Sequence, residues 1–375
     1  MRVTIASLLF IAAMTVPGAK PEAAPAARPT PCVGCLTAAQ RVAYRVWYKS
    51  QPPRVWSAVI GNVGIIEQSD GVVLIDSGGS IPDGRDIAAE VAALTGKPVK
   101  AIAITHWHND HPLGIPGILE RFPKARVIAT AETARMMREI VGRNVGIGRN
   151  DVEMDRRRRE NFAATEKQYR QNAVDPKLTA DERRQFAIEA DYVPQRLARQ
   201  LGNYIVLPTE TFTDTLTIDD PLAPVQLHAP GRGNTGGDLV AWLPRQRVLF
   251  TGDVVVAPSP YGFNSPTHGW IAVLARLKRF PFRRLVPGHG AVQRDTRYLD
   301  TMIWSMSDVD AQVDKAIAAG KTAEQAWEGF DKAAHARRFA AQSPWERRWL
   351  NDYWLEPIVG SAYRELKGEP IVEGT

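Results

Sequence analysis

Four potential metal ligands lie close together in the segment ITHWHNDHPLG, directly after the apolar run Val99–Thr105. They are three histidines and a carboxylate: His106, His108, Asp110 and His111. Imidazole nitrogens and a carboxylate oxygen form a donor set that suits zinc. This spacing is inconvenient for a single tetrahedral ion. We therefore expect His106 and His108 to face one ion, while Asp110 and His111 turn toward a second.

Two later segments supply groups that could complete a two-metal site. The apolar run that begins at Val248 ends in Thr-Gly-Asp253, whose carboxylate could bridge two cations. The run that begins at Leu285 leads into Pro-Gly-His289-Gly290, which places His289 at the tip of a turn. Both groups follow apolar strands, and α/β folds bind ligands at the carboxyl ends of their strands. We expect Asp253 and His289 to join the first cluster.

Strands alternate with helices in the part of the chain that carries these ligands. Short apolar runs indicate buried strands, and the amphipathic runs between them indicate helices. The expected strands are Val72–Ile75, Val99–Thr105 and Arg126–Ala129, and the expected helices are Arg85–Leu94 and Ile115–Arg121. This alternation predicts a layered α/β architecture.

The motifs HWHNDH, TGD and PGHG, in this order, resemble those of the metallo-beta-lactamase superfamily of hydrolases. DSGG at Asp76 and PGRGNTGGD at Pro230–Asp238 resemble two further motifs of the family, and the similarity extends from about Val55 to Val292. The resemblance implies a four-layered αββα sandwich with the metals at one edge of the two central sheets.

The resemblance also implies a role for each matching residue. His106 and His108 match ligands of a first metal, and Asp253 matches a carboxylate that bridges both metals. Asp110, His111 and His289 match ligands of a second metal, and Asp76 matches an acid beside the site.

One position departs from the family pattern. The family has a third first-metal histidine where this chain reads GRGNT, so Asn234 stands in its place. An amide oxygen is a neutral and weaker zinc donor than an imidazole. We expect one or two zinc ions per chain, with the first site the weaker. His228 and His268 are nearby in the sequence and could compensate.

The implied chemistry is hydrolysis by a metal-activated hydroxide. Asp110 would orient the attacking water and pass its proton to the leaving group, and Tyr261 would donate a hydrogen bond to the oxyanion. We expect an exported zinc-dependent hydrolase that attacks an ester, lactone or amide-type carbonyl of a small molecule. Two alternatives remain open: a periplasmic beta-lactamase, and a non-catalytic metal-binding or scaffold protein with a degraded first metal site.

The N-terminus predicts export. Residues 1–24 combine Arg2, an apolar run and small residues, which is the layout of a signal peptide. The expected linker, 25–45, contains Cys32 and Cys35, the two cysteines of the chain. A disulfide between them fits an oxidising compartment. We therefore expect a periplasmic or secreted protein that is free of the membrane once the signal is cleaved.

The family resemblance implies the domain in the middle of the chain, and residue patterns indicate the remaining boundaries and partners. We expect a metallo-hydrolase domain at 46–296, with a helical insert at about 149–200, and a helical C-terminal region at 297–375. The chain has 375 residues and a net charge of +6, with 44% hydrophobic and 23% charged residues. The basic run Arg156–Arg159 is flanked by Glu153, Asp155 and Glu160. This mixture indicates a solvated helix and not a nucleic-acid surface.

Overall fold

The computed structural model describes residues 32, 35–52, 56 and 59–374. The chain forms two compact units, Met1–Cys32 and Val33–Thr375, and every element below belongs to the second. The expected signal peptide and residues 25–31, 33 and 34 of the expected linker lie outside the described residues. In the part of the chain that is described, no helix has the length and apolar character needed to cross a membrane.

The first sheet has seven strands in sequential order, β1 to β7. β1 to β4 pair antiparallel, and β4 to β7 pair parallel. The strands are β1 (Gln40–Ala43), β2 (Val46–Lys49), β3 (Val63–Glu67), β4 (Val72–Ile75), β5 (Val99–Ala103), β6 (Arg126–Thr130) and β7 (Glu210–Phe212). Because β1 already pairs with β2, the sheet begins inside the stretch expected to be linker.

The second sheet has five strands in the order β12-β11-β10-β9-β8. β11 and β12 pair parallel, and the other neighbours pair antiparallel. The strands are β8 (Thr215–Ile218), β9 (Val225–His228), β10 (Val240–Leu243), β11 (Val248–Phe250) and β12 (Arg284–Val286).

Alternating side chains build three apolar layers around these sheets. In β4, Val73 points into a core shared by both sheets, and Leu74 points into a core beneath helices. In β10, Ala241 likewise lies in the shared core, and Trp242 faces the opposite helical layer. This alternation follows from the two-residue period of a strand. The result is the αββα sandwich that the family resemblance implied.

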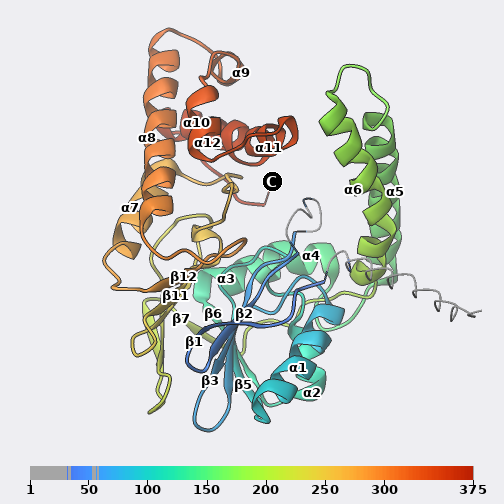
Figure 1. Ribbon diagram of the computed structural model, residues 1–375, viewed down its shortest axis with the longest axis vertical. Helices are drawn as coiled ribbons and strands as arrows, with labels where there is room; N and C mark the ends of the chain where they lie inside the picture. Colours follow the sequence, from blue (N-terminus) through green and yellow to red (C-terminus); the bar gives the residue numbers. More distant parts are fainter. Residues whose placement is uncertain (1–31, 33–34, 53–55, 57–58, 375) are drawn as a thin grey trace, which may run out of the picture. The chain divides into compact units, whose positions relative to one another are not determined.

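Two helices cover the outer face of the first sheet (Figure 1). These are α1 (Ile81–Thr95) and α2 (Ile115–Arg121). The Ser80 side chain caps α1 by accepting from the Asp83 amide, and Gly96 ends it in the left-handed conformation. After β6, the chain runs through α3 (Ala131–Met136), a π-helical turn (Met137–Val141) and α4 (Gly142–Val145).

The expected insert is a pair of long helices, α5 (Val152–Asn172) and α6 (Ala180–Gln200), side by side (Figure 1). α5 has no buried residue, and Arg156 on it pairs with Glu153 and Glu160. These pairs agree with the interpretation of the basic run as a solvated helix.

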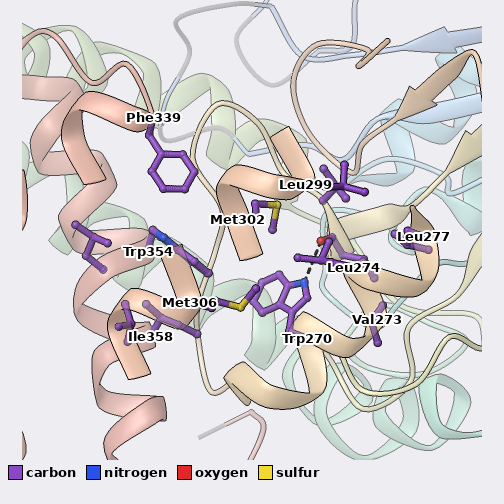
Figure 2. Close-up of a cluster of buried hydrophobic side chains, with 14 of the residues drawn as sticks. Trp270, Val273, Leu274, Leu277, Leu299, Met302, Met306, Phe339, Trp354 and Ile358 are labelled. Atoms are coloured by element: carbon purple, nitrogen blue, oxygen red, sulfur yellow. Dashed lines mark hydrogen bonds between the residues drawn. The ribbon is translucent and has the colours of Figure 1, made fainter. Parts of the chain in front are cut away.

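The C-terminal helices share one core with the second sheet. Figure 2 shows Trp270 and Leu274 of α7 (Thr267–Leu277) packed with Met302 of α8 (Arg297–Ala318) and with Trp354. The Trp270 indole donates to the Val254 carbonyl at 3.0 Å. The remaining elements are α9 (Ala323–Glu328), α10 (Ala333–Arg338), α11 (Pro344–Leu350), a π-helical turn (Asn351–Leu355) and α12 (Glu356–Leu366).

Candidate metal centre

Asp76 anchors the loop that carries the four clustered ligands. It follows β4, and its carboxylate accepts from the Thr105 amide and hydroxyl, each at 2.8 Å. The same carboxylate lies 2.8 Å from Nδ1 of His111. A carboxylate in this position fixes the tautomer and the orientation of the imidazole. Nε2 of His111 is therefore left free to face the site.

Four ligand atoms converge at the position expected for the second metal. His289 Nε2 lies 3.0 Å from Asp110 Oδ2 and 3.3 Å from Asp253 Oδ1. His111 Nε2 lies 3.5 Å from Asp110 Oδ2 and 3.3 Å from Asp253 Oδ1. All four atoms are buried, and none has a hydrogen-bond partner in the described part of the chain.

This arrangement fits zinc. Zinc–ligand bonds of about 2.0–2.1 Å in a tetrahedron place neighbouring ligand atoms about 3.3 Å apart. The four distances between histidine nitrogens and carboxylate oxygens lie around this value. Four buried polar atoms without partners would also be costly unless a cation joined them. Asp110, His111, Asp253 and His289 would hold that ion.

The first-metal residues form a looser group around the other oxygen of Asp253. His106 Nε2 lies 2.9 Å from His108 Nδ1 and 3.6 Å from Asp253 Oδ2. The two oxygens of Asp253 thus face different histidines, as a bridging carboxylate requires. His106 is also held by the Thr105 hydroxyl, 3.0 Å from its Nδ1.

Asn234 presents its amide oxygen without a partner. Its Nδ2 donates to the Tyr261 carbonyl at 2.9 Å, which fixes the orientation of the amide. Its Oδ1 is buried and has no hydrogen-bond partner among the described residues. The Ser265 hydroxyl donates to the Asn234 carbonyl at 2.7 Å. Asn234 therefore offers one neutral oxygen at a fixed position.

Neither histidine considered as a replacement belongs to the ligand groups. His228 lies on β9, where its ring packs against Phe280, and His268 is an exposed residue of α7 that pairs with Glu365. The possibility that one of them compensates for Asn234 is therefore wrong. The reason is position, since both lie near Asn234 in sequence but are held by other partners.

Carboxylates and histidines at the second-metal position shift each other's pKa values in opposite directions. Although burial opposes its ionisation, His111 and His289 lower the pKa of Asp110 to about 2. Although burial opposes its protonation, Asp253 and Asp110 raise the pKa of His289 to about 9. Protons on the histidines thus balance the carboxylates, and a metal would have to displace them.

Two glycines allow the backbone to approach the ligands, and the sequence interpretation did not include them. A Cβ on Gly61 would lie 2.4 Å from Cε1 of His111. A Cβ on Gly288 would lie 2.0 Å from Asp253 Oδ1. Asn62 was also missed, and its amide donates to the carbonyls of Pro287 and Gly290 beside His289. Gly288 belongs to the PGHG motif, which could have identified it. Nothing in the local sequence distinguishes Gly61.

A cavity of about 390 Å³ opens beside His289. Its walls are mainly apolar and include Tyr48, Trp56, Tyr261 and Trp349. The centre of the Tyr261 ring lies 5.4 Å from that of the His289 ring, and both residues line the cavity. Trp349 comes from α11, so the C-terminal region contributes to this pocket.

The family model of the metallo-beta-lactamase superfamily matches residues 56–289. The chain belongs to this superfamily. A "Linear primary-alkylsulfatase" of Pseudomonas sp. (strain ATCC 19151) is 27% identical over 243 residues, or 60% of this chain and 40% of that protein. The chain therefore spans well under half the length of that relative.

Two further comparisons cover a shorter part of the chain or have a lower sequence identity. "Metallo-beta-lactamase type 2" of Bacteroides fragilis is 31% identical over 100 residues, or 25% of this chain and 39% of that protein. The structure of the sec-alkylsulfatase Pisa1 from Pseudomonas sp. gives a TM-score of 0.61 at 16% identity, covering 90% of this chain and 51% of that one. The Pisa1 likeness shows the fold. Together with the family match, these relatives support a metal-dependent hydrolase.

Proposed function

We propose that this chain is a zinc-dependent hydrolase that attacks an ester, lactone or amide-type carbonyl of a small molecule with an apolar group. The observation that carries the proposal is that ligand atoms of Asp110, His111, Asp253 and His289 are buried without hydrogen-bond partners among the described residues. Potential ligands fall into two groups that share His111: Asp110, His111 and His289, and His106, His111 and Asp253. They lie beside an apolar cavity that includes His289 in its wall.

Bound zinc would lower the pKa of a coordinated water to about 7 and stabilise negative charge at the attacked centre. Asp110 is the most exposed of these four ligands, with 20% of its side chain accessible. We assign it the orientation of the attacking water and transfer of the proton to the leaving group. Burial raises the pKa of Tyr261 well above its usual range. Its hydroxyl therefore stays protonated and can donate to the oxyanion.

A substrate panel with zinc-loaded protein tests the proposal. It should include lactones, aryl esters, a chromogenic beta-lactam and alkyl sulfates. We expect turnover of a carbonyl substrate, loss upon chelation and recovery upon return of zinc. His111→Ala should lower both turnover and bound metal at least 100-fold, since loss of a supporting group alone typically costs about 10–100-fold. Full activity in His111→Ala would refute the site.

Sulfate-ester hydrolysis is a second candidate. It is favoured by the linear primary-alkylsulfatase, which is 27% identical to this chain over 60% of its length. Turnover confined to the alkyl sulfates would select it, and turnover confined to the beta-lactam would select a lactamase. Tight zinc binding without turnover of any substrate would favour a non-catalytic metal-binding or scaffold protein.

We also propose that the protein is exported and acts in the periplasm or outside the cell. The apolar N-terminal run and the pair Cys32 and Cys35 support this. The intact mass of protein recovered from the periplasm should correspond to a chain that starts between about Lys20 and Ala27, with the two cysteines oxidised. An unprocessed Met1 or two free thiols would contradict it.

A further inference from the structure

A second cavity of about 250 Å³ adjoins the metal centre but includes none of its proposed ligands. Asn109 of the HWHNDH loop forms part of its wall, next to Asp110. Ile60 forms another part and precedes Gly61, which lies against the His111 ring. The opposite wall comes from the inserted helices α5 and α6. The insert therefore encloses space next to the site of reaction.

Three arginines face this cavity, and two of them are occupied by other groups. Arg158 pairs with Asp155 at 2.5 Å and donates to the carbonyls of Val145 and Asn203. Arg199 is the second arginine whose guanidinium is already paired with carboxylates.

Arg199 pairs with Asp83 at 2.6 Å and with Asp86 at 3.2 Å. Its Nε is nevertheless buried without a hydrogen-bond partner in the described residues. Asp83, the carboxylate in the cavity wall, also accepts from Ser80, so it is already engaged.

Arg196 is the arginine without a counterion. Its guanidinium carbon lies 5.5 Å from the centre of the Phe162 ring, and no carboxylate in the described part of the chain pairs with it. Arg196 is partly buried on α6. A partly buried cation of this kind is stabilised by an anion that can accept its hydrogen bonds. The exposed amides of Asn109 and Asn144 supply further donors to the same space.

We propose that this cavity binds an anionic group of the substrate, a carboxylate or a sulfate-type oxyanion, with Arg196 as its principal contact. The proposal rests on the hydrolase function proposed above and names its substrate class. His289 borders the apolar cavity, and Asn109, the neighbour of Asp110 in the sequence, borders this one, so both cavities adjoin the metal-ligand residues. A substrate with an apolar group on one side of the scissile bond and an anionic group on the other would place one group in each cavity.

Two aryl esters that differ mainly in charge test the proposal by kinetics. They are the 4-nitrophenyl monoester of glutarate, which carries a free carboxylate, and 4-nitrophenyl pentanoate, which is neutral. Arg196→Gln should raise KM for the anionic ester about tenfold, the low end for a lost charged hydrogen bond. It should leave kcat and the neutral ester nearly unchanged. Arg196→Lys should recover part of the loss.

The matched control is Arg184→Gln, which removes the same charge from a solvent-exposed position of α6. It should behave like the parent protein. Equal effects of Arg196→Gln on both esters, or no effect on either, would overturn the proposal.

A binding measurement separates this proposal from the catalytic one. Monomethyl glutarate and pentyl sulfate are titrated calorimetrically into the zinc-loaded full chain, with no turnover required. At least one should bind the parent and bind Arg196→Gln about tenfold more weakly. This result would support the anion site even if neither ester were hydrolysed. Unchanged affinity in Arg196→Gln, or no binding of either anion to the parent, would overturn it.

Discussion

At the scale of single residues, the two proposed metal positions differ in the quality of their donors. The second has two imidazoles and two carboxylates at nearly equal spacing. The first would have His106, His108 and a shared Asp253, and the further donor that we propose there is the neutral amide oxygen of Asn234. Anionic and imidazole donors bind zinc more strongly than an amide. Occupancy of the two positions should therefore be unequal.

We predict that purified protein carries nearer one zinc ion than two per chain, and that the second enters at higher free zinc. Asn234→His should raise the occupancy toward two, because it supplies a third imidazole to the first position. Elemental analysis after mild chelation measures this. Two zinc ions that resist chelation in the parent would show that Asn234 binds better than its chemistry indicates.

At the scale of elements, the loop between β9 and β10 is held in shape by Asp238. Its carboxylate accepts from the Gly233 amide at 3.1 Å and from the Thr235 hydroxyl at 2.6 Å. Burial raises the pKa of Asp238 to about 7, from an ordinary 3.8. The Asp238 carboxyl group thus binds its proton more tightly in the folded protein than in the unfolded chain. The stability that it contributes is complete below about pH 4 and is lost as the pH rises to about 7.

We predict that Asp238→Asn flattens this part of the pH profile. The variant should be less stable overall, because an amide group would face the Gly233 donor. Its free energy of unfolding should nevertheless fall less than that of the parent between pH 4 and pH 7. Urea unfolding at several pH values measures the difference. Parallel profiles would show that Asp238 stays ionised throughout this range.

Trp349 of helix α11 lines the apolar cavity that we propose as the substrate pocket. Trp349 stacks on Tyr353 with ring centres 3.8 Å apart and lines the apolar cavity. We predict that Trp349→Ala raises KM for long-chain esters about tenfold and for short-chain esters much less, because it removes apolar contact area. Trp345→Ala is the control, since Trp345 lies on the same helix and packs on Phe186. The same increase for both chain lengths would contradict this role.

At the scale of the whole molecule, residues 297–366 do not form a separate body within the described unit. Trp354 is completely buried, donates to the Ser305 hydroxyl at 2.9 Å and meets Trp270 edge to face. Leu249 and Leu285 of the second sheet belong to the same core. Loss of this core should therefore affect the sheet that carries Asp253.

We predict that Trp354→Ala lowers the free energy of unfolding by about 3–5 kcal/mol, the usual cost of a large core truncation. Unfolding should remain one transition, with metal release and loss of helix at the same denaturant concentration. Trp327→Ala, at a partly buried position, should cost less. An early transition that removes helix but leaves metal bound would show that the C-terminal region unfolds independently.

The sequence by itself determined the ligand types, their order and the elements that carry them. The short apolar runs became β4, β5 and β6, and Ile115–Arg121 is a helix with the same bounds. These features depend on local periodicity and on ligand spacing, which the sequence contains directly. The αββα sandwich followed from the family resemblance.

Tertiary structure decided which atoms meet. It left Oδ1 of Asn234 buried without a hydrogen-bond partner among the described residues, and it placed His228 and His268 beside other residues. It also brought Trp349 and Arg196 beside the site from distant helices. Such contacts join residues that are remote in sequence, and packing between elements sets them. Local periodicity carries no information about that packing, so no motif could have revealed the two cavities.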